Sequence, residues 1–305
     1  MRCYQKCFGS ENDQRRSGLD KALHGFYSSY QGYEAFESGN WKPEFWAPIR
    51  AEIEAILSSG TCKVLEIGAG RTGFADYLGS LRNRVEFHVQ DITDRNSEYL
   101  LQKADKVHVG DAIDINETYD IIFSTFAYEH ITRPRATIEH LLRIVTTRGC
   151  IFLASPRYDC PFYISPSARH LQWFHRLAIA GGLMFRRLGV LSGGTPLFLI
   201  HFDPAVLHRP WFRDADAVHW PSLWDLERIL PDDYVLQRLR IAAPSLRGRF
   251  WARFLLLFVR IGSRNRSVNQ RWCTVGRTAE NAMPPPQTVC VSPEDSSAGP
   301  RPYGS

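Results

Sequence analysis

The sequence lacks several features that would assign it to a class at once. Its 305 residues contain no apolar run of about 20 residues, so no membrane-spanning helix is predicted. Its first seven residues lack the apolar core of a secretion signal. The seven cysteines are scattered and odd in number, and Cys3 and Cys7 have no downstream pair at metal-like spacing. We therefore expect reduced thiols in a cytoplasmic protein, without a zinc site.

Acidic residues are missing from one long stretch near the C-terminus. Between Ile241 and Ala279 there are eight arginines and no Asp or Glu, although the net charge of the chain is only +5. Residues 247–266 mix these arginines with bulky apolar side chains, which is compatible with peripheral contact with an anionic membrane surface. A core-packed helix between two C-terminal strands, whose arginines reach solvent, explains the pattern better. No nucleic-acid-binding motif accompanies the arginines, so no nucleic-acid partner is predicted.

The most specific pattern present is a glycine-rich turn after an apolar segment. The run Val64–Ile67 leads into Gly68, Gly70 and Gly73, and a helix-compatible segment begins at Phe74. A strand, a tight glycine turn and a helix start form the usual cradle of a nucleotide-like cofactor. Glycine permits this because a Cβ would clash with a closely approaching ligand. A turn that holds no ligand is the alternative.

The carboxylate of Glu66, two residues before the first glycine, bears on the cofactor. A dinucleotide places a pyrophosphate at such a turn, where the Glu66 charge would oppose it. S-adenosylmethionine carries no phosphate, and its ammonium and sulfonium suit a nearby carboxylate. The residues thus favour S-adenosylmethionine over NAD, with Arg71 arguing weakly the other way.

Further strands follow in order, and the second and third are followed by acids. Strands are predicted over 85–90, 106–109, 119–124 and 150–155, and a helix over 134–145. Asp91 follows the second strand of the series and Asp111 the third. An acid at the end of the second strand can bond both ribose hydroxyls, although an ordinary turn beginning at Asp91 is the alternative.

Together these motifs resemble a class I S-adenosylmethionine-dependent methyltransferase of the small-molecule type. The main matching runs are Val64–Gly70, Gln90–Ile92, Gly110–Ala112, Tyr119–Ser124 and Glu129–Ile131. The resemblance is strong over residues 61–157 and loose over 222–278. It implies an α/β fold with a Rossmann-like, seven-stranded, mostly parallel sheet and an antiparallel C-terminal strand. It also implies helices on both faces, an N-terminal helical cover and an inserted lid.

The resemblance implies cofactor contacts at ten positions: Glu66, Gly68, Ala69, Gly70, Asp91, Ile92, Asp111, Ala112, Phe126 and Ala127. The glycine turn would face the methionine half of the cofactor and Asp91 the ribose. Asp111 would accept from the exocyclic amine of adenine, and Phe126 would lie near the methyl group. The family usually has a third small residue where this chain has Thr72, which leaves the role of Gly73 open.

A general base is expected because an oxygen acceptor gains from losing its proton near neutral pH. His130 follows the fourth strand, beside the expected methyl position, and is the catalytic candidate. The alternative is that His130 packs against or caps the following helix. The expected acceptor is a small molecule, a glycan or a lipid-like compound, methylated at an oxygen.

Residues 157–221 form an insertion that is longer than the family's usual link. It lies at the carboxyl end of the sheet, where ligands bind, so it is predicted to be a substrate lid. Tyr158, His170 and His201 are its candidates for acceptor contact. His170 and His175 are five residues apart, which does not suit a metal pair on one helix face, and no metal is predicted.

The two ends of the chain complete the expected organisation. Residues 1–18 are polar and predicted to be loose, and Leu19–Leu57 is predicted to be helical and aromatic-rich. There Tyr27, Tyr30 and Trp46 either face substrate or pack in the core. A helix is predicted over 221–231, and strands over 233–241 and 271–277. The expected domains are a cover (1–60), the methyltransferase domain (61–278) and a disordered tail (279–305).

Two other functions compete with methyl transfer. An NAD(P)-dependent oxidoreductase on a Rossmann-like sheet is opposed by Glu66 and by the expected antiparallel strands. A non-catalytic binding protein of the same fold is opposed by the complete set of Glu66, Asp91 and Asp111. The sequence does not predict an oligomeric state.

Overall fold

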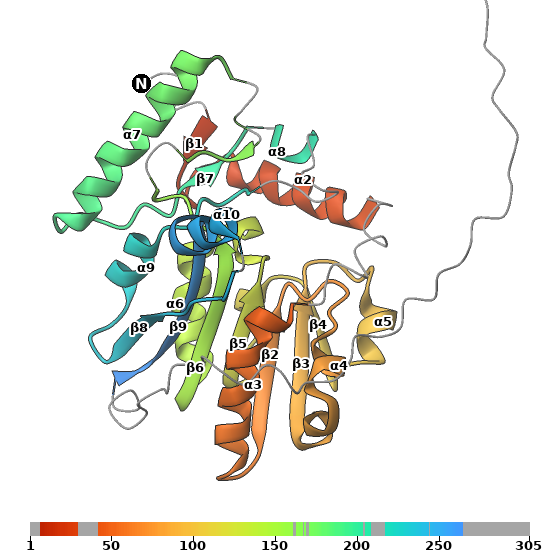
Figure 1. The fold of residues 1–305 in the computed structure, drawn as a ribbon. Helices are drawn as coiled ribbons and strands as arrows, with labels where there is room; N and C mark the ends of the chain where they lie inside the picture. The colour runs from red at the N-terminus through yellow and green to blue at the C-terminus, as the bar shows by residue number, and fades with distance from the viewer. Residues whose placement is uncertain are drawn as a thin grey trace, which may run out of the picture. The chain divides into compact units, whose positions relative to one another are not determined.

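The computed structural model describes residues 7–29, 42–160, 163–166, 168, 171–203, 205–208, 217–243 and 245–264. Figure 1 shows a central sheet flanked by helices, with a smaller layer of helices and short strands above the upper ends of the strands. None of the helices in these residues combines the length and apolarity that crossing a bilayer requires.

The central sheet has seven strands in the order β4-β3-β2-β5-β6-β9-β8. Their bounds are Cys62–Ile67 (β2), Val85–Asp91 (β3), Lys106–Val109 (β4), Tyr119–Thr125 (β5), Val145–Pro156 (β6), Tyr234–Arg238 (β8) and Leu256–Ser263 (β9). Strands β2 to β6 pair in parallel, whereas β9 is antiparallel to both of its neighbours, β6 and β8. The predicted Rossmann-like α/β sheet with an antiparallel C-terminal strand is confirmed.

The antiparallel strand does not lie where the sequence predicted a seventh strand. Residues 271–277 lie outside the described residues, and Leu256–Ser263 occupies the position between β6 and β8. The interpretation of this run as part of a helix is therefore wrong for β9. The helical interpretation is correct only for the two segments that precede β9, which are α10 (Leu246–Phe250) and the π-helical turn Trp251–Leu255. A short apolar run buried on both faces has no periodicity that separates a strand from a buried helix.

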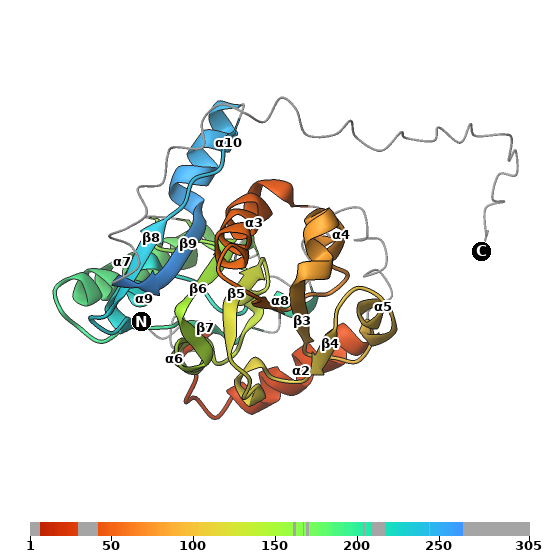
Figure 2. The ribbon, with the colours of Figure 1, turned by 90° about the horizontal axis from the view of Figure 1, so that it is seen from below.

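Helices cover both faces of the sheet. Helices α3 (Pro43–Leu57), α4 (Phe74–Leu78) and α5 (Ser97–Leu101) pack on one face, and α6 (Pro134–Ile144) and α9 (Leu223–Ile229) on the other. Figure 2 shows α3 and α4 on the opposite side of the sheet from α6 and α9. Because both faces are covered, every residue of β5 is buried, which explains the continuous apolar run that predicted this strand.

A second layer, which we call the cap, joins the N-terminal segment to the insertion. It comprises β1 (Phe8–Gly9), α2 (Arg16–Ser29), α7 (Trp173–Leu191), β7 (Ile200–His201) and α8 (Ala205–His208). Strand β1 pairs antiparallel with β7, so segments about 190 residues apart fold together. The expectation that residues 1–18 are loose is wrong for Phe8, which is buried in the apolar core of the cap. A two-residue strand is too short to leave a periodic pattern in the sequence.

Candidate functional site

A cleft lies between the carboxyl ends of the parallel strands and helix α2 of the cap. Its lining includes seven of the ten predicted cofactor positions: Gly68, Asp91, Ile92, Asp111, Ala112, Phe126 and Ala127. Asp20, Leu23 and Tyr27 contribute from α2. The cleft has about 850 Å³ of empty space, counting the part open to solvent.

Side chains of β3 hold the glycine turn in place. The backbone N–H of Gly68 donates to Oε1 of Gln90, and that of Gly70 to Oδ2 of Asp91, both at 3.0 Å. The Nε2 of Gln90 also donates to the carbonyl of Gly110, at 2.5 Å. Gln90 thus links the loops after β2 and β4 and lines the cleft. No local pattern predicts this role, because it depends on the parallel register of three strands.

The three turn glycines have different requirements. Gly68 and Gly70 have φ values of +66° and +55°, in the left-handed region that favours glycine. A Cβ on Gly68 would lie 2.3 Å from Cβ of Ala127, so Gly68 lets the turn approach the loop after β5. Gly73 has a φ of −99°, which any residue can adopt. The hydroxyl of Thr72 accepts from the N–H of Phe74 at the start of α4, so Thr72 serves the turn in place of a third small residue.

Glu66 lies near the end of β2, two residues before Gly68, and 4% of its surface is exposed. Burial raises the pKa of the Glu66 carboxyl to about 8, against the lowering effects of the Thr72 hydroxyl and the Lys42 ammonium. Within the described residues, Oε2 of Glu66 has no hydrogen-bond partner. A buried carboxylate oxygen in this state gains from a cationic or hydrogen-bonding group supplied from outside the chain.

The acid that ends β3, Asp91, and the acid after β4, Asp111, have different surroundings. Asp91 is buried, and burial raises its pKa although backbone N–H groups, Gly70 among them, donate to it. The Oδ1 of Asp111 accepts from the N–H of Ile113, and its Oδ2 pairs with Nη2 of Arg133 at 2.5 Å. Each oxygen of Asp111 keeps a second lone pair for a further donor. Arg133 was missed in the sequence, where it is one of 37 basic residues with no distinguishing context.

His130 lines the cleft at the end of a 3-10 turn, Tyr128–His130. Its backbone N–H donates to the carbonyl of Ala127, which ties it to the loop after β5. Its ring lies 6.2 Å from that of Tyr27 of α2, at an interplanar angle of 81°. Tyr27 therefore faces the cleft and does not pack in the core, which were the two alternatives expected from the sequence. Trp46 is instead buried in the core against Phe74, and Tyr30 lies outside the described residues.

Two of the three predicted acceptor contacts of the insertion lie in the apolar core of the cap. Tyr158 is buried and stacks on Trp220 with ring centroids 5.0 Å apart, and His201 is buried against Phe8 at 4.8 Å. Neither lines the cleft, so the prediction that these two side chains face the acceptor is corrected. His170 lies outside the described residues. Tyr158 and Trp220 of the insertion instead belong to a separate apolar core of the cap.

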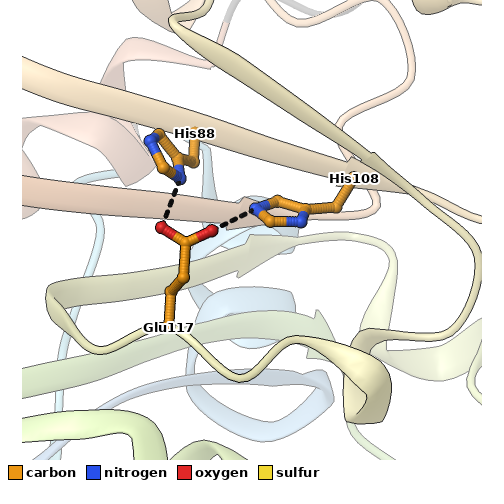
Figure 3. Close-up of side chains that lie close together, drawn as sticks. All are labelled: His88, His108 and Glu117. Atoms are coloured by element: carbon orange, nitrogen blue, oxygen red, sulfur yellow. Dashed lines mark ion pairs between the residues drawn. The ribbon is translucent and has the colours of Figure 1, made fainter.

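Among the described residues, one group of side chains has the composition of a metal site. The ligand atoms of His88, His108 and Glu117 lie within 4.8 Å of one another (Figure 3). The ammonium groups of Lys106 and Lys63, 2.5 Å and 2.6 Å from the same carboxylate, hold the pKa of Glu117 at about 2. These two cations already neutralise the carboxylate and would repel a metal ion. We interpret the group as an ion-pair network that joins β2, β3 and β4 to the loop before β5.

Comparisons with known proteins agree with this arrangement. A family model described as a methyltransferase domain matches residues 38–190. No curated protein matches the chain.

Solved structures with a similar fold share little sequence with this chain. The plantazolicin methyltransferase BamL, in complex with a triazolic desmethylPZN analog and SAH, is 11% identical over 82% of this chain and 97% of that chain, with a TM-score of 0.47. The N-methyltransferase NodS from Bradyrhizobium japonicum WM9, in complex with S-adenosyl-L-homocysteine, is 16% identical over 77% and 98%, with a TM-score of 0.40. The 1,6-didemethyltoxoflavin-N1-methyltransferase from Burkholderia thailandensis is 12% identical over 80% and 88%, with a TM-score of 0.46.

Proposed function

This chain belongs to the class I S-adenosylmethionine-dependent methyltransferases, and we propose that it methylates an oxygen atom of a small-molecule acceptor. The family is shown by the matched methyltransferase domain, and the strand order of the sheet agrees with it. The cofactor is S-adenosylmethionine, and the oxidoreductase and non-catalytic alternatives are set aside. The proposal of an oxygen acceptor rests on one observation, the position of His130 in the cleft opposite Tyr27.

The residues of the glycine turn fit this cofactor. The unpartnered Oε2 of Glu66 suits the ammonium of the methionine moiety, and the left-handed Gly68 allows close backbone approach. Asp91 would hold the ribose hydroxyls and Asp111 the adenine amine. Ala69, Gly70, Ile92, Ala112, Phe126 and Ala127 would complete the contacts. When bound, the cofactor supplies an electrophilic methyl group on a sulfonium.

The chain's own contribution to the reaction is orientation, exclusion of water and removal of one proton. The loop after β5 and helix α2 both line the cleft, so both would help to align the acceptor and limit solvent. His130 would accept the hydroxyl proton of the acceptor as the oxygen attacks.

The lining of the cleft favours an acceptor with an apolar body. Leu23, Tyr27 and Ile131 present apolar or aromatic surface, whereas the hydroxyl of Thr132 donates to the carboxylate of Asp20 beside them. Of the three expected acceptor classes, this composition suits a lipid-like hydroxyl compound better than a glycan.

We also propose that the protein is cytoplasmic and meets a membrane surface through part of residues 247–266. Strand β9 is buried, so the contact would fall to α10 and the π-helical turn. Support comes from the exposed apolar side chains there, Leu246, Phe250 and Phe254, which alternate with Arg247, Arg249 and Arg253.

The function is tested by incubating the purified protein with labelled S-adenosylmethionine and extracts rich in hydroxylated lipids. We expect a product 14 mass units heavier, with the added CH₂ on oxygen in fragment spectra, a mass that follows from replacing H by CH₃. Transfer to nitrogen or carbon would contradict the oxygen proposal and leave the methyltransferase assignment intact.

The base is tested by His130→Ala, which we expect to lower turnover by about 10²–10⁴-fold, the usual contribution of general base catalysis. The variant should also lose the limb of the pH–rate profile that belongs to the base, with cofactor affinity unchanged. A thermal melt is the control. Full turnover, or a loss that follows unfolding alone, would show that His130 is a packing residue.

A further inference from the structure

Helix α7 of the cap is apolar on two opposite faces, although it lies on the surface. One face packs into the cap through Ile179, Leu183 and Val190. The other exposes large apolar side chains, of which Trp173 is 66% exposed and Phe185 79%. The remaining members are Phe174, Leu177, Leu188 and Leu191.

These six side chains form one continuous stripe. Their spacing along the helix places them on the same side over its 19 residues, and no charged residue interrupts the stripe. Surface helices of water-soluble proteins normally have a polar outer face. An uninterrupted apolar outer face indicates a partner that is itself apolar.

The charges around this stripe are of one sign. No Asp or Glu occurs between Asp159 and Asp203 in the sequence. Helix α7 carries three arginines, Arg176, Arg186 and the buried Arg187, and no acid, and helical geometry places all three outside the stripe. An apolar stripe on a helix whose charges are all positive complements a surface that is apolar inside and anionic at its boundary.

A second cationic feature lies nearby. A groove between β8, β9 and the α10 segment is lined by Arg157, Arg238, Arg240, Arg249 and Arg253. Leu223 of α9 also lines this groove, and α7 packs against α9. Among the described residues, Arg240, Arg249 and Arg253 pair with no carboxylate, so their charges are available to phosphates.

We propose that α7 lies in the headgroup region of an anionic bilayer, with its apolar stripe among the acyl chains and the arginine groove receiving lipid phosphates. A second copy of this chain fits less well, since a two-fold contact would bring the same arginines toward one another. The proposal does not depend on the nature of the methyl acceptor.

Vesicle sedimentation of the full-length protein tests the proposal directly. We expect binding to vesicles of phosphatidylcholine mixed with phosphatidylglycerol and weaker binding to phosphatidylcholine alone. Added salt should reduce the difference between the two. The double variant Phe185→Glu/Leu188→Glu should lose about tenfold or more in vesicle affinity, because two apolar side chains that would be buried among the acyl chains are removed. Arg240→Gln/Arg249→Gln should lose the preference for the anionic lipid while keeping part of the binding.

Leu101→Glu is the matched control, since Leu101 is an apolar side chain of α5 that is 63% exposed. Helix α5 connects β3 to β4, at the other edge of the sheet from β8. This variant should bind vesicles as the parent does. Lipids brominated in the acyl chain should quench the parent's fluorescence more than that of Trp173→Phe, which reports insertion at the start of α7.

Three results would overturn the proposal. The first is absence of binding to every vesicle, and the second is equal binding by the parent and the Phe185→Glu/Leu188→Glu variant. The third is a parent protein that does not bind vesicles but is a dimer in light scattering, and that becomes a monomer in the same variant. Affinity for S-adenosylhomocysteine, measured on the same variants, should not change, so a failure here is separate from a failure of the proposed function.

Discussion

At the scale of the residue, we propose that Glu66 is the group that discriminates between cofactors. Its carboxyl is buried near the end of β2, beside the glycine turn, with its pKa raised to about 8 by desolvation and one oxygen lacking a partner among the described residues. A pyrophosphate in this turn would raise the cost of ionising Glu66 further, whereas an ammonium would lower it. We therefore expect the preference for S-adenosylmethionine to depend on Glu66.

Cofactor binding should release a proton from Glu66. In the free protein the group stays protonated between its ordinary pKa of 4.5 and about 8, and the ligand's ammonium favours the ionised form. Affinity for S-adenosylhomocysteine should therefore rise with pH through this window and level off above it. Calorimetry in two buffers of different ionisation enthalpy should show up to one proton released near pH 7.

The same group should affect stability in the opposite direction. Because the folded protein holds more protons than the unfolded chain in this window, the free energy of unfolding of the free protein should fall as pH rises from 4.5 towards 8. Glu66→Gln should remove both the proton release and this slope. Equal proton release by parent and variant would assign the effect to another group.

Gly68→Ala should disrupt the turn, whereas Gly73→Ala should be tolerated. Gly68 has φ +66° and no room for a Cβ beside Ala127, so alanine there should cost about 1–3 kcal/mol in backbone strain, plus the cost of the clash. Gly73 has an ordinary φ of −99°, so its variant is the matched control. Denaturant unfolding and titration with S-adenosylhomocysteine measure both effects, and equal losses in the two variants would contradict the assigned roles.

At the scale of elements, the cap depends on a strand of two residues. Phe8 of β1 stacks on His201 and contacts Trp220 edge-on, at centroid distances of 4.8 Å and 4.7 Å. Removing this side chain leaves a cavity between the N-terminal segment and the insertion. The cap is therefore expected to open locally before the sheet unfolds.

Phe8→Ala should destabilise the cap by about 3–5 kcal/mol, the usual cost of a buried phenylalanine. Hydrogen exchange should speed up in α2 and α7 and stay unchanged in β2, β3 and β5. Leu246→Ala, at a side chain 78% exposed, should change neither region. Uniformly faster exchange in the whole protein after Phe8→Ala would instead mean that the cap and sheet unfold together.

The parallel part of the sheet could be predicted because each strand carries its own signal. The run of β2 leads into the glycine turn after Ile67, and those of β3 and β4 lead to Asp91 and Asp111. The glycine pattern makes the assignment of β2 more specific. Strand β9 was not predicted, since its apolar run follows directly on that of α10 and the π-helical turn, with no turn signal between them to separate a strand from a buried helix. The pairing of β1 with β7 and the position of His201 depend on contacts between distant segments, which local patterns do not contain.

The same distinction holds for the cleft. Residues that follow strands were found from the sequence, because the carboxyl ends of parallel strands share one edge. Gln90 and Arg133 were missed, since their side chains act across strands. Aromatic side chains of the insertion were assigned to substrate, whereas a cap of this size needs them for a core of its own.

At the scale of the whole molecule, the cap has two surfaces with different partners. Helix α2 faces the cleft, and α7 turns an apolar stripe outward. If α7 binds a bilayer, the cleft beneath the cap is held near the membrane, where an acceptor with an apolar body is concentrated. The lipid-like acceptor and the membrane contact are thus compatible, although each has its own test.

The central claim, that the cleft binds S-adenosylmethionine, is tested most directly by calorimetric titration of the parent and of Asp91→Ala with S-adenosylhomocysteine and with NAD. The parent should bind S-adenosylhomocysteine at one site and show no heat with NAD. Asp91→Ala should weaken S-adenosylhomocysteine binding by about 1–3 kcal/mol, because ribose hydroxyls and the N–H of Gly70 lose their acceptor. Binding of NAD in place of S-adenosylhomocysteine, or unchanged affinity in Asp91→Ala, would contradict the account.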